Sequence, residues 1–225
     1  EVDVIVFDCL DYCRDLYKKC KKKSIFSVGI DTSSNISILL DVLVNPVIKN
    51  KFSNLSGPMY SIHYEDPKNY NYNYNTYKTK KIFICFGGLD YKNHLKKLTP
   101  FLKNIPDSYE INVVLSKNTK TVDLTFLNNT KVFYDPKDFY TILKQSTMAI
   151  ISGGILLQEA QYLGIPAFVI PQYKHQLEVA KKKFDTSSII GFSSLRPEYS
   201  QIIDRIKTSL KDFKKLKNIS NVSRS

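Results

Sequence analysis

The fold of this chain is decided by the stretch Ile150-Ile151-Ser152-Gly153-Gly154-Ile155-Leu156-Leu157-Gln158-Glu159-Ala160-Gln161-Tyr162-Leu163-Gly164-Ile165-Pro166. Its apolar start belongs to a buried strand expected at 148–151, and the next residues predict a helix at 154–163 that opens on paired glycines. Gly164 and Pro166 then end the helix and lead into another strand at 166–170. A strand, a helix and a further strand in this order are typical of a parallel sheet.

The same alternation extends to both sides of this stretch. Further strands are expected at 82–86, 110–116, 131–134 and 187–190, and further helices at 91–104, 121–128, 138–145 and 174–184. Continuous β-branched strands that alternate with amphipathic helices predict an α/β fold with a doubly wound, Rossmann-like parallel sheet. One long basic helix is expected at 197–217, followed by a frayed tail at 218–225.

The front of the chain predicts a second, smaller unit of the same type. Strands at 3–8, 24–30 and 38–44 surround a helix at 11–22, and because a strand follows Glu1 almost at once, we expect an N-terminal domain that is incomplete here. The predicted domains are therefore 1–60 (the rear part of the N-terminal domain), 61–80 (a linker with alternating Asn and Tyr), 81–196 (the C-terminal domain) and 197–225 (the basic helix and tail).

Composition excludes several classes of protein. With 43% hydrophobic and 24% charged residues, the 225-residue chain is typical of a globular protein and not of a disordered one. It has no apolar run of the length, about 18 residues, that a membrane-spanning helix needs, and no signal peptide is recognised. The four cysteines form no C-x-x-C pair. We therefore expect reduced thiols in a cytoplasmic protein, with no metal site and no cofactor.

The net charge of +12 raises the question of an anionic partner. Its lysines are spread over helix ends and exposed faces, without a recognition helix or a single-strand-binding motif, which predicts no specific nucleic-acid partner. The basic helix at 197–217 allows weak contact with an anionic membrane surface, although its apolar face fits core packing better. The oligomeric state stays open.

Two glycine loops follow strands of the C-terminal domain, Phe86-Gly87-Gly88-Leu89-Asp90 and Ser152-Gly153-Gly154. A tight turn explains either loop alone, but two at the same edge of one sheet favour a ligand, since backbone and helix N-terminus together suit a phosphate or diphosphate. Glu159 lies in the second helical turn after the second loop. Its carboxylate could accept hydrogen bonds from two ribose hydroxyls, or could only improve the electrostatics of the helix.

These two loops, together with Glu159-Ala160, Gly164-Ile165-Pro166 and the later Pro171, His175-Gln176 and Ala180, resemble the nucleotide-binding half of the GT-B glycosyltransferase class. Within that class the chain is most similar to the UDP-2,4-diacetamido-2,4,6-trideoxy-β-L-altropyranose hydrolase of flagellin-sugar (pseudaminic acid) biosynthesis and to the related spore-coat polysaccharide biosynthesis proteins. The resemblance spans roughly residues 3–184 and is weaker before residue 60.

The resemblance implies that a UDP-sugar binds in a cleft between two Rossmann-like domains. The implied nucleotide-sugar-binding residues are Gly87, Gly88, Asp90, Ser152, Gly153, Gly154, Glu159, His175 and Gln176. Among them the second glycine loop would hold the diphosphate, Glu159 the ribose and Gln176 the sugar. The hydrolases use a His in a Gly-rich turn after their first strand, and this chain has no such turn, so no catalytic residue is assigned.

Three functions follow from this resemblance. A UDP-sugar hydrolase that releases UDP in bacterial surface-glycan or nonulosonic-acid biosynthesis is the first expectation. A GT-B glycosyltransferase that passes the sugar from a UDP-sugar to an acceptor is the first alternative. A non-catalytic nucleotide-sugar-binding or partner subunit is the second alternative, because the catalytic His turn is missing.

Overall fold

The computed structural model describes residues 2–8, 14–30, 40–46, 54–57, 60–61, 79–119 and 122–224. The chain divides into two compact units, Glu1–Glu65 and Asp66–Ser225, and the division falls inside the predicted linker. Most of that linker lies outside the described residues, as do Cys9, Cys13, Asp31 and His63.

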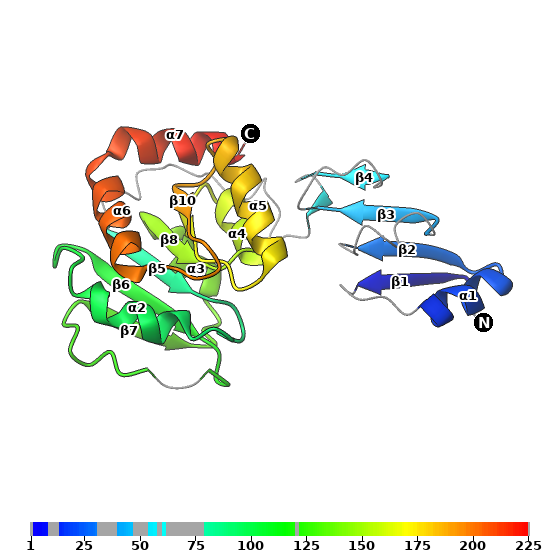
Figure 1. Ribbon diagram of the computed structural model, residues 1–225, viewed down its shortest axis with the longest axis horizontal. Coiled ribbons are helices and arrows are strands. Elements are labelled where there is room, and N and C mark those ends of the chain that lie inside the picture. The colour runs from blue at the N-terminus through cyan, green and yellow to red at the C-terminus, as the bar shows by residue number, and fades with distance from the viewer. Residues whose placement is uncertain are drawn as a thin grey trace. The chain divides into compact units, whose positions relative to one another are not determined.

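The first unit contains a parallel sheet with the strand order β1-β2-β3-β4 (Figure 1). Its elements are β1 (Val4–Asp8), α1 (Arg14–Lys22), β2 (Phe26–Ile30), β3 (Val42–Asn45) and β4 (Leu55–Ser56). The two-residue β4 was not predicted, since so short a segment carries no periodic signal. A small core of Phe7, Tyr17, Leu40 and Leu43 joins the helix to the sheet.

Asp41 secures the junction between β2 and β3. Its carboxylate forms an ion pair with Lys21 and accepts hydrogen bonds from the backbone N–H of Ser27 at 2.8 Å and the hydroxyl of Ser27 at 2.6 Å. The hydrogen bonds from Lys21 and Ser27 lower the pKa of Asp41 to about 2. Asp41 therefore stays ionised at neutral pH as a structural group of this unit.

The second unit is built on a six-stranded parallel sheet with the order β10-β9-β8-β5-β6-β7. Its strands are β5 (Lys81–Cys85), β6 (Glu110–Leu115), β7 (Thr130–Tyr134), β8 (Met148–Ile151), β9 (Ala167–Val169) and β10 (Gly191–Phe192). The chain extends the sheet from β5 through β7 in one direction and from β8 through β10 in the other. The strand order thus reverses between β5 and β8, which is where sheets of this type bind ligands.

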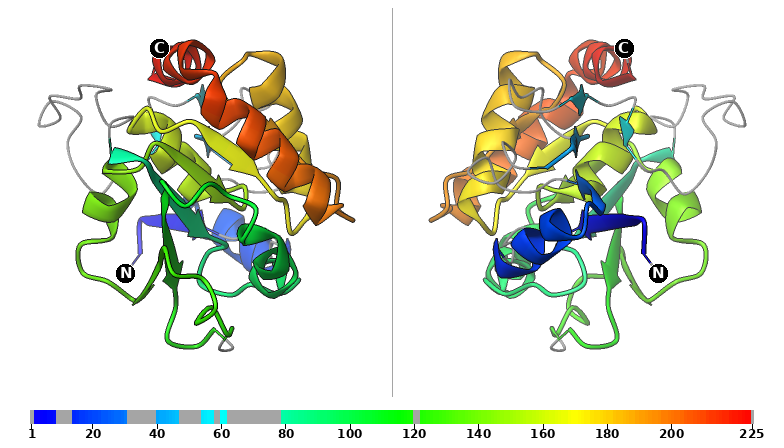
Figure 2. Two further views of the ribbon diagram at one scale, coloured as in Figure 1. Left: turned by 90° about the vertical axis from the view of Figure 1, so that its left-hand side faces the viewer. Right: turned by 90° about the vertical axis from the view of Figure 1, so that its right-hand side faces the viewer.

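Helices cover both faces of this sheet, which confirms the predicted doubly wound α/β fold. They are α2 (His94–Leu102), α3 (Phe139–Lys144), α4 (Ile155–Tyr162), α5 (Lys174–Asp185), α6 (Tyr199–Lys211) and α7 (Phe213–Arg224). On one face α2 and α6 lie side by side and share a core with the sheet (Figure 2). On the other face α4 contacts β8 and β9, and the Phe139 ring of α3 packs edge-on against Phe83 of β5.

Three predicted elements of this unit differ from the structure. The helix expected at 121–128 is wrong for the described residues 122–128, which form turns, because the Asp123 carboxylate accepts hydrogen bonds from the N–H and hydroxyl of Thr125 and so competes with helical bonding. The strand expected at 187–190 begins later, at Gly191.

The single long helix expected at 197–217 is also wrong. It is broken at Asp212, whose carboxylate accepts a hydrogen bond from the N–H of Lys215 at 3.0 Å and so caps a new helix, α7. This helix runs through residues expected to fray, since Leu216 and Ile219 are buried in the core. The basic C-terminal segment is therefore part of the packed unit.

Gly164 ends α4 in the left-handed conformation, with φ of +66°. The N–H of Gly164 bonds to the carbonyl of Gln161 and the N–H of Ile165 to that of Ala160, the pattern of a Schellman C-cap. A Cβ at this position would meet Arg224 Cδ at 2.6 Å, because α7 packs on this turn. The Gly-x-Pro segment noted in the sequence therefore ends α4, leads the chain back into the sheet and provides the surface on which α7 packs.

Candidate functional site

An open depression of about 980 Å³ lies at the carboxyl edge of the second unit's sheet. Its walls come from both glycine loops, the end of β6, the β7–α3 connection, α4 and the β9–α5 connection. Seven of the nine predicted binding residues line it: Gly87, Gly88, Ser152, Gly153, Gly154, Glu159 and Gln176. Asp90 and His175 are not among the lining residues.

Strand pairing brings the two glycine loops together. Cys85 at the end of β5 pairs with Ile151 at the end of β8, so both loops leave the sheet at the same level. A Cβ built on Gly87 would lie 3.9 Å from the Ser152 hydroxyl oxygen, an ordinary contact distance. The two loops, which lie far apart in the sequence, form one continuous surface.

Different physical reasons account for the glycines of this surface. Gly154 has φ of +100°, a conformation that L side chains rarely adopt, and a Cβ on Gly153 would lie 2.8 Å from Gln176 Cβ of α5. By contrast, a Cβ on Gly88 would meet no atom within 4 Å. The fold itself thus requires glycine at 153 and 154, while at 88 it leaves open space in the depression.

The N-terminus of α4 opens into the depression without a side-chain cap. Its N-cap residue is Gly154, whose carbonyl accepts the N–H groups of Leu157 and Gln158, and Ile155 at the first helical position is 69% exposed. The backbone N–H groups that precede Leu157 have no acceptor within the helix, and they form the positive end of the helix dipole. This arrangement is suited to an anion such as a phosphate.

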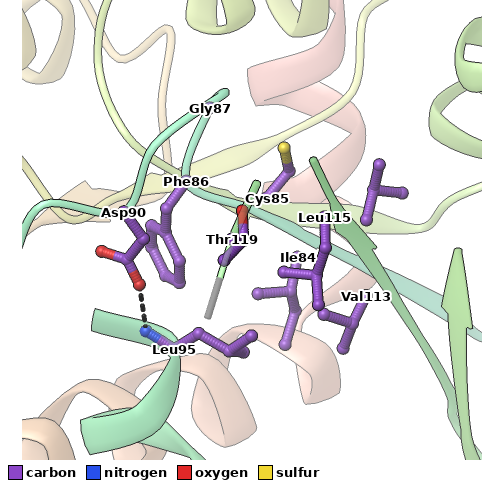
Figure 3. A pocket seen from close by; sticks show the side chains of 10 residues that line it. Ile84, Cys85, Phe86, Gly87, Asp90, Leu95, Val113, Leu115 and Thr119 are labelled. Atoms are coloured by element: carbon purple, nitrogen blue, oxygen red, sulfur yellow. Dashed lines mark hydrogen bonds between the residues drawn. The ribbon is translucent and has the colours of Figure 1, made fainter. Parts of the chain in front are cut away.

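The first glycine loop differs, because Asp90 caps the helix that follows it. Its carboxylate oxygens accept hydrogen bonds from the backbone N–H groups of His94 and Leu95, each at 2.8 Å. Figure 3 shows the bond to Leu95. Beneath this loop the apolar residues of β5 and β6 line a hollow of about 10 Å³, no more than one water molecule needs. The structure therefore places Asp90 as a helix cap rather than in the depression.

Glu159 is half-buried in the wall of the depression, where its carboxylate accepts a hydrogen bond from the Tyr140 hydroxyl of α3. Burial raises the pKa of Glu159, and the hydrogen bond from Tyr140 works in the opposite direction. Tyr140 was missed in the sequence, since nothing in the local pattern connects it to a residue on another helix. Only the packing of α3 against α4 brings them together.

Gln172 is a second residue missed in the sequence. Its side chain is buried and its Nε2 donates to the carbonyl of Phe86 at 2.8 Å and, more weakly, to that of Leu89 at 3.4 Å. Its backbone N–H donates to Gln176 Oε1 at 2.8 Å. Gln172 thus joins the β9–α5 connection to the first glycine loop, and Gln176 holds the backbone of Gln172. Its position just after a buried strand was the available signal.

The described histidines lie outside the lining of the depression. His94 is buried, its Nδ1 lies 2.8 Å from the Tyr199 hydroxyl, and burial lowers its pKa. His175 is exposed and its ring stacks on Tyr173, with centroids 5.6 Å apart and planes 8° from parallel. Burial raises the pKa of the Cys85 thiol to about 11, so this lining residue is not a thiolate at neutral pH. No catalytic base is assigned from these groups.

Across the described ranges, His, Cys, Asp and Glu form no group of three or more that could hold a metal ion. In the same part of the chain, every helix is too short or too polar to cross a membrane.

No protein-family model matches this sequence. It is similar to the spore coat polysaccharide biosynthesis protein SpsG of Bacillus subtilis, with 24% identity over 93% of this chain and 68% of that protein. It is also similar to the uncharacterized protein MJ1062 of Methanocaldococcus jannaschii, with 27% identity over 78% of this chain and 42% of that protein.

Several solved structures share the fold. MurG of Acinetobacter baumannii has a TM-score of 0.74 at 15% identity and covers 99% of this chain and 69% of its own. The spinosyn rhamnosyltransferase SpnG, complexed with thymidine diphosphate, has a TM-score of 0.68 at 11% identity, covering 99% and 68%. Phytolacca americana UGT2, complexed with UDP-2fluoro-glucose and pterostilbene, has 0.65 at 12%, covering 98% and 71%. The chain has the GT-B fold, as the sequence predicted.

Proposed function

We propose that this protein is a GT-B glycosyltransferase that takes its sugar from a UDP-sugar donor and acts in polysaccharide biosynthesis. The observation that carries the proposal is the uncapped N-terminus of α4, which opens beside both glycine loops at the point where the strand order reverses. A diphosphate supplies the anion that this helix end lacks, and the open space at Gly88 allows close approach of a ligand.

The other polar side chains of the depression indicate how the nucleotide sugar would be oriented. Tyr140 and Glu159 lie where α3 meets α4, and a ribose at this point donates its hydroxyls to the Glu159 carboxylate. Gln172 and Gln176 lie at the β9–α5 connection, where Gln176 packs beside Gly153 and Gln172 bonds to the first glycine loop. With the diphosphate at α4 between them, the sugar extends toward the glutamines.

Transfer is proposed in preference to hydrolysis, the first expectation from the sequence. The solved structures that share the fold include transferases from several sources, and the relative SpsG is named for polysaccharide biosynthesis. The hydrolase expectation and the pseudaminic acid pathway therefore have no further support.

Calorimetric titration with UDP tests the site. Wild-type protein should bind UDP, and Glu159→Ala should weaken binding at least tenfold, about 1.4 kcal/mol, because the ribose hydroxyls lose their acceptor. Glu178→Ala, which removes an exposed carboxylate of α5 paired with Lys181, is the matched control and should bind as wild type does. Equal affinity in wild type and Glu159→Ala would refute the ribose assignment.

A second experiment separates the reactions. UDP release from a panel of UDP-sugars is measured with and without glycan and lipid acceptors. Release that depends on an acceptor supports transfer, whereas release at the same rate without any acceptor identifies a hydrolase. Binding of UDP without turnover under either condition would favour the non-catalytic alternative.

A further inference from the structure

Large apolar side chains are exposed together on the rim of the depression. Tyr91 is 66% exposed and Tyr173 is 41% exposed, and Leu89 and Ile155 are exposed beside them. All four line the same depression, although they come from three separate segments of the chain. Apolar side chains that cluster around a concave site, rather than lying singly on a surface, mark a place of contact with a ligand or partner.

Two of these side chains, Tyr91 and Tyr173, form a connected set with His175, which lies just outside the lining; the three rings are named here the aromatic rim. The Tyr91 and Tyr173 rings have centroids 6.2 Å apart with planes at 63°, and His175 stacks nearly parallel to Tyr173. Stacking on His175 restricts the rotation of the Tyr173 ring, which is otherwise partly in solvent. The role of His175 at this edge is therefore to hold the Tyr173 ring in place.

A buried clamp fixes the two loops that carry the aromatic rim. Because Gln172 Nε2 contacts two carbonyl oxygens, Phe86 and Leu89, the orientation of this amide is determined by its partners. The clamp ties the loop that leads to Tyr91 to the residue just before Tyr173, and Gln176 holds the backbone of Gln172. The two tyrosines are therefore positioned before any ligand arrives, which lowers the entropic cost of binding.

We propose that the aromatic rim binds the glycosyl group of the nucleotide sugar, with the C–H face of the sugar ring against Tyr91 and Tyr173. This inference rests on the proposed function, because the diphosphate at α4 and the ribose at Glu159 direct the sugar to this side of the depression. The face of an aromatic ring carries negative charge density and attracts the weakly positive C–H groups of a pyranose. The hydroxyls of the sugar then remain free for polar groups and water.

The test compares two ligands on the full chain. Calorimetric affinities for UDP, UDP-glucose and UDP-N-acetylglucosamine are measured for wild type, Tyr91→Ala and Tyr173→Ala. We expect each alanine variant to weaken the tighter UDP-sugar by about fivefold, while affinity for UDP changes less than twofold. Tyr173→Phe keeps the ring and should restore UDP-sugar affinity. Phe184→Ala is the matched control, since Phe184 of α5 is 42% exposed, much like Tyr173 just before that helix, but lies outside the depression.

Each outcome decides the inference. A loss confined to the UDP-sugar supports the aromatic rim as a glycosyl subsite. Unchanged affinity for both ligands, or an equal loss for both, overturns it and assigns the rings to another partner or to the fold. Wild-type protein that does not bind UDP at all contradicts the proposed function itself, which is a different result from a failure of the variants alone.

Discussion

The helices α2 and α4 follow similar loops, but a carboxylate caps the N-terminus of α2 and no side chain caps that of α4. Each helix follows a paired glycine and a buried strand, and the two strands are neighbours in the sheet. At α2 the Asp90 carboxylate accepts two backbone N–H groups, so the helix supplies its own anion. At α4 no side chain caps the helix, and its positive end faces the depression.

This difference shows why paired glycines alone are a weak sign of a phosphate site. A carboxylate two residues after one pair turns that loop into a structural cap, while an apolar residue after the other pair leaves the donors free for a ligand. Only α4 is therefore expected to hold the diphosphate, and Asp90 is expected to repel an anion from α2. The four predictions that follow test this contrast, in order of decreasing effect.

The largest effect is expected when α4 is made to resemble α2. Ile155→Asp places a carboxylate at the exposed first position of α4, where it occupies the region expected for the phosphate. UDP affinity should fall about a hundredfold, since two charges in near contact at a protein surface repel by a few kcal/mol. Ile155→Asn, similar in size and uncharged, is the control. Isothermal titration at several salt concentrations checks the result, and similar affinity in both variants would locate the diphosphate elsewhere.

The next effect concerns the two classes of glycine. Gly153→Ala should lower the free energy of unfolding by about 1–3 kcal/mol, because its Cβ overlaps Gln176 Cβ and forces α5 to move. Gly88→Ala meets no atom within 4 Å and should leave that free energy nearly unchanged. Urea unfolding followed by circular dichroism measures both. Equal stability of the two variants would contradict the distinction drawn between them.

A smaller effect is expected at the capped helix. Asp90→Ala removes two hydrogen bonds from the N-terminus of α2 and should cost about 1 kcal/mol of stability, as losses of helix caps usually do. UDP affinity should change little, since Asp90 does not line the depression. Asp90→Asn retains an acceptor and should recover part of the stability. A large loss of UDP affinity with normal stability would instead show that Asp90 takes part in UDP binding.

The smallest effect is a shift of pH dependence at Glu159. Burial raises the pKa of this carboxyl, so UDP affinity should decline as the pH falls through that raised value and the carboxylate becomes neutral. Stability should change in the opposite sense. Because the folded-state pKa lies above the unfolded one, protonation favours the folded protein, and the free energy of unfolding should rise as the pH falls through the raised pKa.

Tyr140→Phe sharpens this pH test. It removes the hydrogen bond that lowers the pKa of Glu159, so the decline in UDP affinity should begin at a higher pH than in wild type. Titrations across a pH series on wild type, Tyr140→Phe and Glu159→Gln measure the shift, and the last variant corrects for protonation of the ligand's own phosphate. An identical pH profile in wild type and Tyr140→Phe would separate Tyr140 from the function of Glu159.

Local patterns were sufficient for the fold class, and seven of the nine residues that they proposed for binding line one depression. The strands β5, β6 and β8 were predicted because continuous apolar runs are strong signals, and the Gly-x-Pro step was recognised because left-handed glycine caps are local. The break at Asp212 was missed because a side-chain cap inside a helical periodicity leaves no pattern of its own. β4 was missed because two residues are too few to show a periodicity. The turn at Asp123 was missed because its hydrogen bonds from Thr125 leave no hydrophobic pattern.

The sequence by itself determined that two parallel α/β units are present, that two glycine loops leave the same edge of one sheet, and that Glu159 follows the second loop. These features depend on contacts within a few residues and on hydrophobic period. Only the tertiary structure decided that the strand order reverses between β5 and β8, that Asp90 closes one helix while α4 stays open, and that Gln172 joins loops more than eighty residues apart. Such contacts depend on which strands become neighbours, and that is set by the packing of the whole sheet rather than by any local run of residues.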